Sequence, residues 1–167
     1  MKRVLLTGMS GTGKSTVIGE LAARGYKAVD TDTDEWSEWV AFTPIPGVKE
    51  APFEPDKEWV WREERIETLL DTEDAAVLFV SGCASNMRRF YERFDQIILL
   101  SAPADVLVER LATRTSNRYG KHPDELARVL GHLETVEPLL RRVAGHEVDT
   151  SVPLEQVVAA VLRLVRP

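Results

Sequence analysis

The sequence predicts a three-layer α/β domain in which helices cover both faces of a five-stranded parallel sheet. Two observations support this prediction. The apolar pattern switches repeatedly between short strand-like runs and longer runs with helical spacing, which is typical of alternating β and α units. In addition, most of the strand-like runs end in a short turn that contains glycine, serine or proline. Strands connected in this way pair in parallel. We expect all 167 residues, 1–167, to form a single domain.

The expected strands are short buried runs of apolar residues. The first ends at Gly8, the second is followed by an acidic segment, and the last is indicated mainly by its context. Their expected bounds are residues 4–6, 28–29, 77–80, 97–100 and 146–148. Because the carboxyl ends of parallel strands meet at one edge of a sheet, we expect the functional residues to lie at that edge.

Two segments in the second half of the chain have the spacing of amphipathic helices. Residues 154–165 place apolar side chains at intervals of three and four, and residues 126–140 do the same. Pro138 lies inside the second segment, and a proline within a helix removes a hydrogen bond and clashes with the preceding turn. We therefore expect this segment to be kinked or split.

Residues 41–62 interrupt the regular pattern and form a candidate substrate-binding insert. Residues 41–56 are rich in proline, which makes a regular helix or strand there unexpected, and long loops of this kind are usually functional or disordered. All four tryptophans flank residues 41–56, and two interpretations are open. They could pack a helical lid onto the core, or some of them could line a substrate pocket. The tryptophans are Trp36, Trp39, Trp59 and Trp61.

Composition excludes several classes of function. The chain has 27 acidic and 21 basic residues, so its net charge of −6 argues against binding to a nucleic-acid polymer. No apolar run is long enough to span a membrane, and the N-terminus has no signal-peptide pattern. The single cysteine cannot form an internal disulfide. We expect a cytoplasmic protein, either a monomer or a homodimer.

A phosphate-binding motif follows the first expected strand. Residues 8–15, Gly-Met-Ser-Gly-Thr-Gly-Lys-Ser, match G-x-x-x-x-G-K-[ST] at every fixed position and open an expected helix. Backbone N–H groups of such a loop surround phosphate oxygens, the lysine reaches the β- and γ-phosphates, and the serine hydroxyl binds Mg²⁺. The motif therefore predicts ATP and Mg²⁺ as cofactors. The expected nucleotide contacts are Gly8, Ser10, Gly11, Thr12, Gly13, Lys14, Ser15 and Thr16.

Residues downstream of this loop resemble those of the small P-loop kinases, the group that holds the shikimate, gluconate and adenylate kinases. The first point of resemblance is Asp30-Thr31-Asp32 after the second strand. The resemblance implies that Asp30 contacts Mg²⁺ and that Asp32 binds the substrate and orients or deprotonates its attacking hydroxyl. Asp34 could take the place of Asp32. The alternative is a solvated acidic turn that caps the next helix.

A basic segment, residues 110–122, is similar to the mobile lid of these kinases. The resemblance implies that Arg114 neutralises charge on the transferred phosphoryl group and that Arg110 lies against the adenine or the phosphates. With Lys14 and Asp32, Arg114 completes the expected catalytic set. The alternative for this segment is a basic loop in water.

Two further substrate contacts follow from the resemblance to shikimate kinases. Arg62 lies where those enzymes hold a substrate-binding arginine, although it could instead pair with a neighbouring glutamate on a helix face. Gly82 lies in Ser81-Gly82-Cys83, where they carry a glycine triplet that approaches the substrate. The triplet is incomplete here, and Val136 stands where they place an arginine two residues before a proline. These departures argue against shikimate as the acceptor.

The expected activity is transfer of the γ-phosphoryl group of Mg-ATP to a small-molecule acceptor through a hydroxyl or phosphate group. Nucleosides, nucleotides, sugar acids and hydroxylated antibiotics are all open candidates. The alternative from another class is a regulatory ATPase that has no small-molecule acceptor. That alternative predicts slow hydrolysis that depends on a protein partner.

Overall fold

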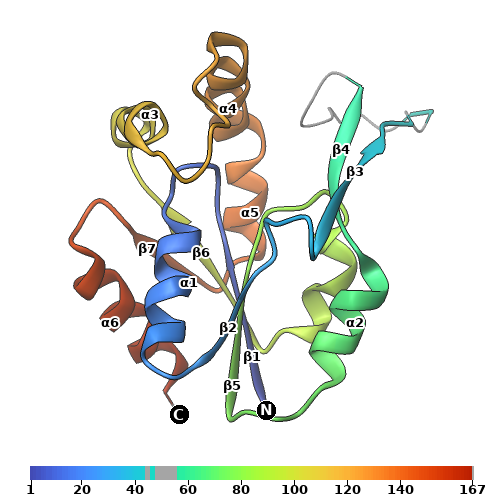
Figure 1. Cartoon of the computed structure of the whole chain (residues 1–167), viewed down its shortest axis with the longest axis vertical. Coiled ribbons are helices and arrows are strands. Elements are labelled where there is room, and N and C mark those ends of the chain that lie inside the picture. Colours follow the sequence, from blue (N-terminus) through green and yellow to red (C-terminus); the bar gives the residue numbers. More distant parts are fainter. Residues whose placement is uncertain (44–45, 48–55, 167) are drawn as a thin grey trace.

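A computed structural model describes residues 1–43, 46–47 and 56–166. Its central sheet has five parallel strands in the order β2-β5-β1-β6-β7. Together with helices on both faces, this sheet confirms the predicted three-layer α/β fold (Figure 1). The strands are β1 (Lys2–Thr7), β2 (Lys27–Asp30), β5 (Val77–Ser81), β6 (Gln96–Ser101) and β7 (His146–Asp149).

Alternation along β1 assigns each side chain to one of two cores. Val4 and Leu6 belong to one buried cluster and Leu5 to the other, because successive side chains of a strand point to opposite faces. Val4, Leu5 and Leu6 are fully buried, as expected for the central strand of a sheet that is covered on both sides.

Helices α1 (Lys14–Ala23) and α6 (Leu154–Val165) supply the apolar side chains that cover one face. Helix α2 (Glu63–Asp71), the 3₁₀ segment η1 (Met87–Arg93) and α5 (Glu137–Val143) contribute to the other. The helix predicted over 154–165 is confirmed. None of the helices in the described part of the chain is long and apolar enough to cross a lipid bilayer.

The segment predicted over 126–140 forms two helices. Helix α4 (Pro123–Thr135) ends before Val136, and α5 begins immediately after it, with Pro138 in its first turn. Proline is tolerated there because the first turn of a helix leaves its N–H groups without helical partners. Helices α3 (Ala104–Thr113) and α4 lie beyond the carboxyl end of β1 (Figure 1).

Three of the four tryptophans lie on a two-stranded antiparallel hairpin. Strands β3 (Ser37–Ala41) and β4 (Lys57–Trp61) pair with Trp39 directly opposite Trp59. Of the two open interpretations, the helical form of a lid is therefore wrong, because aromatic and β-branched residues on these segments favour strand pairing. Trp61 packs in the core, whereas Trp39 and Trp59 line a cavity. The prediction of irregular structure over 41–56 falls largely on residues 44–45 and 48–55, which lie outside the described residues.

Candidate active site

The glycine-rich loop joins the end of β1 to the start of α1. Gly13 caps the helix with a φ of 92°, a backbone conformation that side chains with a Cβ rarely adopt. Within the loop, the Thr12 hydroxyl donates a hydrogen bond to the Met9 carbonyl at 2.8 Å. The loop therefore turns tightly and leads directly into the N-terminus of α1, where backbone N–H groups favour an anion.

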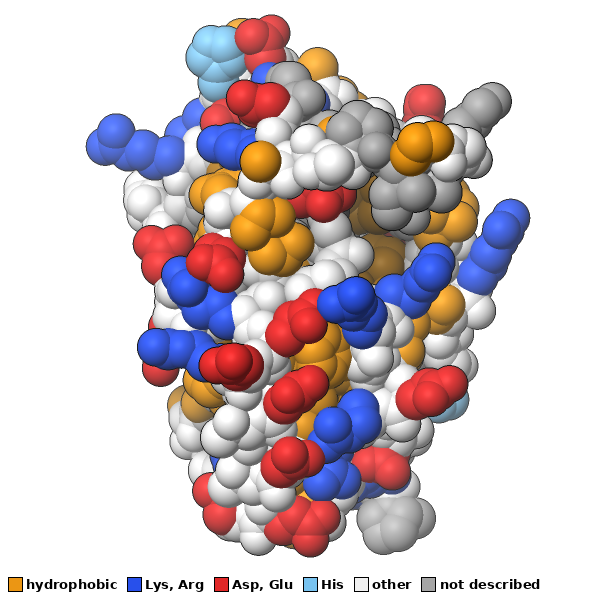
Figure 2. All heavy atoms as spheres, turned by 90° about the vertical axis from the view of Figure 1, so that its right-hand side faces the viewer, with side chains coloured by type: hydrophobic (Ala, Val, Ile, Leu, Met, Phe, Trp, Pro, Cys, Tyr) orange, Lys and Arg blue, Asp and Glu red, His pale blue; other side chains and the backbone are white. Residues whose placement is uncertain are grey.

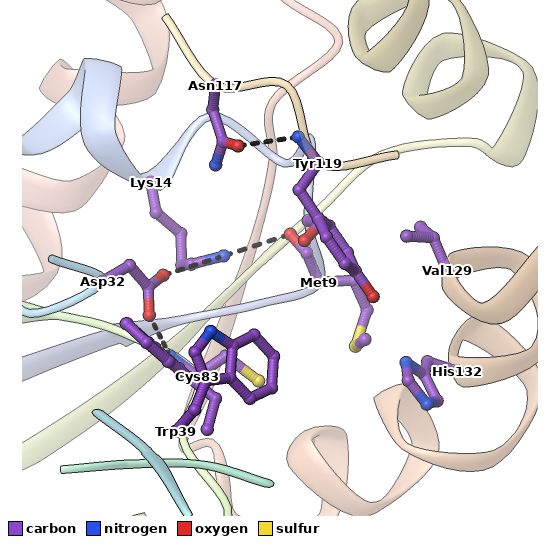
Figure 3. A pocket seen from close by; sticks show the side chains of 11 residues that line it. Met9, Lys14, Asp32, Trp39, Cys83, Asn117, Tyr119, Val129 and His132 are labelled. Carbon is purple, nitrogen blue, oxygen red and sulfur yellow. Dashed lines mark hydrogen bonds and ion pairs between the residues drawn. The ribbon is translucent and has the colours of Figure 1, made fainter. Parts of the chain in front are cut away.

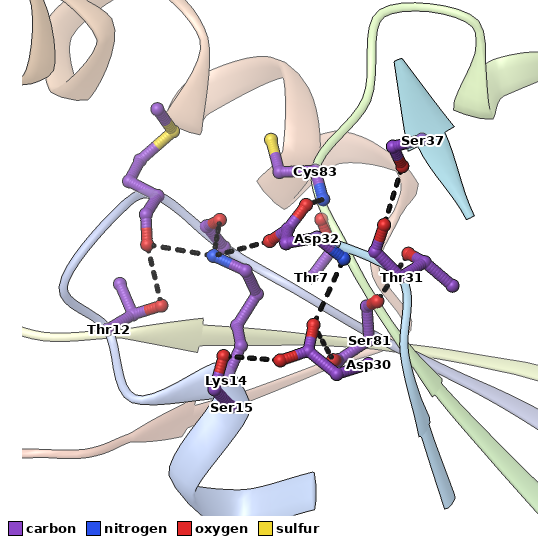
Figure 4. Close-up of polar contacts among 12 residues, drawn as sticks. Thr7, Thr12, Lys14, Ser15, Asp30, Thr31, Asp32, Ser37, Ser81 and Cys83 are labelled. Atoms are coloured by element: carbon purple, nitrogen blue, oxygen red, sulfur yellow. Dashed lines mark hydrogen bonds and ion pairs between the residues drawn. The ribbon is translucent and has the colours of Figure 1, made fainter. Parts of the chain in front are cut away.

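Lys14 is buried, and its side chain extends back toward the first residues of this loop. Its ammonium donates hydrogen bonds to the carbonyls of Gly8 at 2.8 Å and Met9 at 3.1 Å. It also lies 3.9 Å from Asp32 Oδ2 (Figure 4). A single buried cation thus connects the glycine-rich loop with the acidic segment that follows β2.

Asp30 and Ser15 lie side by side at the start of α1. The Ser15 hydroxyl donates a 2.5 Å hydrogen bond to Asp30 Oδ2, and the Asp32 N–H donates to Asp30 Oδ1 at 3.0 Å (Figure 4). A hydroxyl and a carboxylate fit Mg²⁺, which prefers oxygen ligands and usually keeps several waters or phosphate oxygens. The described residues contain no cluster of three or more His, Cys, Asp or Glu that could hold a metal ion. Phosphate and water oxygens would therefore complete the coordination.

The Asp32 carboxylate lies at the carboxyl edge of the sheet and points toward Lys14. The Cys83 N–H donates to its Oδ1 at 3.4 Å. Burial raises the pKa of Asp32, and the positive charge of Lys14 and a hydrogen bond with the Trp59 side chain oppose that rise. Asp34, by contrast, is exposed. Of the two carboxylates left open by the sequence, only Asp32 is placed beside Lys14.

A cavity of 320 Å³ opens beside Asp32, between the hairpin, the glycine-rich loop and α4 (Figure 3). Its size is suited to a small organic molecule. We call it the hairpin pocket. It is lined by Met9, Ser10, Lys14, Asp32, Trp39, Trp59, Cys83, Asn117, Tyr119, Val129 and His132.

A second cavity, of 390 Å³, surrounds the glycine-rich loop, and we call it the loop pocket. Predicted nucleotide contacts from Ser10 to Thr16 line it, together with Arg110 and Arg114. Gly8 does not line it. Its backbone packs closely against β6, where a Cβ would lie 2.3 Å from the Leu100 carbonyl oxygen. The two pockets share Ser10, Lys14, Asp32 and Asn117, so they meet at the Lys14–Asp32 pair.

The two predicted lid arginines differ in their contacts. Arg110 donates to the Thr150 hydroxyl at 3.0 Å and to the Gly11 carbonyl at 3.3 Å. Arg114 donates to the carbonyls of Asn117 at 3.1 Å and Tyr119 at 2.5 Å. Burial lowers the pKa of Arg114, which means that its charge is only partly solvated. Both arginines line the loop pocket, and backbone or hydroxyl oxygens accept hydrogen bonds from their guanidinium groups.

Two predicted substrate contacts, Arg62 and Gly82, lie outside the lining of the hairpin pocket. The Arg62 guanidinium makes a 2.8 Å ion pair with Glu38 and donates to the Asp34 carbonyl at 3.1 Å. Gly82 packs against Thr31 and Trp61, since a Cβ there would lie 2.2 Å from Thr31 Oγ1 and 3.1 Å from Trp61 Nε1. Neither residue lines the hairpin pocket. Pairing with a glutamate was the alternative expected for Arg62, although its partner comes from β3 rather than from its own helix. A substrate role for Arg62 or Gly82 stays a prediction.

Several pocket residues were not selected from the sequence. Asn117 and Tyr119 lie within the predicted lid, in which only basic residues were expected to bind the nucleotide. Val129 and His132 lie three residues apart on α4, so they share one face of that helix. The apolar spacing of this helix indicated a core-facing stripe, and only the placement of α4 beyond the sheet edge turns part of it toward a cavity.

We expect the pH dependence of kcat/KM to follow the protonation of the Asp32 carboxylate. A general base acts in its deprotonated form, so a raised pKa moves the loss of activity on acidification to a higher pH than an exposed aspartate would produce. The measurement is kcat/KM between about pH 4 and 8, with folding monitored by circular dichroism at each pH. An activity that stays constant down to the pH of acid unfolding would contradict this assignment.

A parallel sheet whose first strand leads through this glycine-rich loop into a helix defines a P-loop nucleotide-binding protein. Residues 4–131 match the family model described as an AAA domain. Among curated proteins, a shikimate kinase of Rhodopseudomonas palustris is 31% identical over 159 residues, which span 93% of this chain and 76% of the relative. Shikimate kinase 2 of Yersinia enterocolitica is 29% identical over 170 residues, spanning 96% and 94%.

The fold is also found in a solved structure, shikimate kinase from Acinetobacter baumannii in complex with shikimate. That structure superposes with a TM-score of 0.65 at 19% sequence identity. The match covers 99% of this chain and 93% of the shikimate kinase chain. The chain belongs to the AAA domain family. Its similarity to shikimate kinases also identifies it as one of the small P-loop kinases. It is therefore an ATP-dependent phosphotransferase that acts on a small molecule.

Proposed function

We propose that this kinase transfers the γ-phosphoryl group of Mg-ATP to a hydroxyl group of a small molecule bound in the hairpin pocket. The observation that carries the proposal is that the hairpin pocket and the loop pocket meet at Lys14 and Asp32. A phosphoryl donor in one pocket and an acceptor in the other would face each other across this pair. A hydroxyl acceptor is favoured over a phosphate acceptor, because Asp32 is a carboxylate that can accept a hydroxyl proton.

In the proposed reaction, the acceptor hydroxyl oxygen forms a bond to the γ-phosphorus while the bond from that phosphorus to the β–γ bridging oxygen breaks. The hydroxyl proton passes to the Asp32 carboxylate, and ADP leaves with the bridging oxygen. A partly buried Asp32 with a raised pKa is a stronger base than an exposed aspartate. Its hydrogen bond from the Cys83 N–H holds the carboxylate in place.

Cationic groups around the loop pocket are suited to the charge of the transferred group. Lys14 would exchange its hydrogen bonds to loop carbonyls for phosphate oxygens, and Arg114 would add a second positive charge from the lid. Arg110, fixed by Thr150, would lie along the nucleotide. Ser15 and Asp30 would hold Mg²⁺, which when bound neutralises phosphate charge.

The proposal is tested by measuring ADP formation from Mg-ATP in the presence of nucleosides, nucleotides, sugars, sugar acids and aminoglycoside-like alcohols. We expect at least one hydroxylated compound to raise the rate about tenfold or more over basal hydrolysis, since closure around an acceptor excludes water. Mass spectrometry of the product should show one added phosphoryl group on that compound. Slow hydrolysis that no acceptor changes would contradict the proposal and favour a regulatory ATPase.

A further inference from the structure

Aromatic and apolar side chains form part of the wall of the hairpin pocket. Trp39 on β3 and Trp59 on β4 pack with ring centroids 5.1 Å apart and an interplanar angle of 57°. Trp39 is 43% exposed, so part of this residue is accessible to a ligand. Tyr119, Met9 and Val129 add further apolar surface to the lining (Figure 3). Such walls favour a ligand with a flat, weakly polar ring face.

Charge in this pocket is sparse and already balanced. Lys14 is the only lysine or arginine among its described lining residues, and Asp32 is the only acidic residue. The two side chains lie 3.9 Å apart, and Lys14 also faces the loop pocket. Among the described lining residues, an anionic group on the acceptor would therefore meet Asp32 with no lysine or arginine other than Lys14, which already lies beside Asp32 and the loop pocket. Such a placement is unfavourable in a partly desolvated site.

Cations on the hairpin, at the start of α2 and on η1 have partners of their own. Arg62 pairs with Glu38 at 2.8 Å and Arg89 pairs with Glu63 at 2.6 Å. The Lys57 ammonium lies 4.5 Å from the centroid of the Trp39 ring and is not among the pocket-lining groups. On this face of the molecule, positive and negative side chains are interspersed rather than gathered by sign (Figure 2).

We infer that the acceptor is a hydroxylated ring compound that carries neither a carboxylate nor a phosphate group. Its ring lies against Trp39, and a hydroxyl on the ring reaches Asp32. The inference rests on the proposed function and narrows it, because it removes nucleotides and sugar acids from the candidate acceptors. Nucleosides and uncharged or amino-substituted sugars remain as candidates, because they have a hydroxylated ring and no carboxylate or phosphate group.

The inference is tested with matched pairs of compounds that differ in one anionic group. The pairs are adenosine and adenosine monophosphate, glucose and glucuronate, and methyl shikimate and shikimate. Binding is measured by quenching of tryptophan fluorescence in the presence of ADP at about pH 8, where ordinary histidines are neutral. We expect the non-anionic member of at least one pair to bind about tenfold or more tightly than its partner. Preference for the anionic member, or equal binding within every pair, would overturn the inference.

A tryptophan variant tests the ring contact separately. Trp39→Leu should weaken binding of the preferred compound about tenfold while leaving the fluorescence of the buried Trp61 as an internal reference. Trp36→Phe is the matched control, since Trp36 packs against the core and does not line the pocket. Unchanged affinity in Trp39→Leu would contradict stacking at this site.

Failure of the inference can be told apart from failure of the proposed function. Binding is measured without turnover. Tighter binding of an anionic acceptor therefore overturns the inference, even when the enzyme phosphorylates that acceptor with Asp32 as the base. The absence of acceptor-dependent ADP formation with every compound contradicts the proposed function, whatever the binding preference.

Discussion

Replacement of Asp32 by asparagine is expected to lower kcat by about 100- to 10,000-fold, the usual contribution of a general base. An amide can still accept the hydrogen bond from the Cys83 N–H, so the local structure should persist. It cannot take the acceptor proton at neutral pH. Because Asp32 lies at the junction of the two pockets, ATP binding should change much less than kcat. Steady-state kinetics with the stimulating acceptor, and nucleotide binding by calorimetry, measure the two effects.

Asp34→Asn is the matched control for this variant. Asp34 is exposed and stands two residues further along the same acidic segment. We expect its kcat to stay close to that of the unaltered protein. A large loss of kcat in Asp34→Asn together with a mild loss in Asp32→Asn would reverse the assignment of the base.

Replacement of Lys14 by alanine is expected to reduce kcat about 100- to 1,000-fold, as loss of one group that stabilises transition-state charge usually does. Lys14 is the buried cation that spans the loop and the acidic segment. A second readout follows from the electrostatics. Because the positive charge of Lys14 lowers the pKa of Asp32, its removal should raise that pKa further and move the acid limb of the residual activity to higher pH.

Lys27→Ala provides the control for loss of a lysine. Lys27 begins β2, at the edge of the sheet opposite the glycine-rich loop, and pairs with exposed Asp74. Its removal should leave kcat within about twofold, since exposed ion pairs contribute little. An acid limb that stays in place in Lys14→Ala would show that Lys14 does not influence Asp32, and equal activity losses in both lysine variants would indicate a nonspecific effect.

The parallel sheet and the glycine-rich loop could be predicted from the sequence because both depend on local patterns. Each central strand is a short apolar run, and the loop combines glycine positions with Lys14 and Ser15 at fixed spacing. Asp30 and Asp32 could also be located, since residues that follow a parallel strand lie at its carboxyl edge. The resemblance to small P-loop kinases added the segment that holds Arg110 and Arg114.

The acceptor side of the site depends on contacts between segments that are distant in the chain. Trp39 and Trp59 meet only because β3 and β4 pair across the insert, and His132 reaches the pocket only because α4 lies beyond the sheet edge. Arg62, which the resemblance suggested as an anion contact, forms an ion pair with Glu38 on β3. Local periodicity and motifs carry no information about such long-range pairing. The glycine-rich loop and its position after the first strand could therefore be predicted from the sequence. The shape and charge of the hairpin pocket depend on tertiary packing.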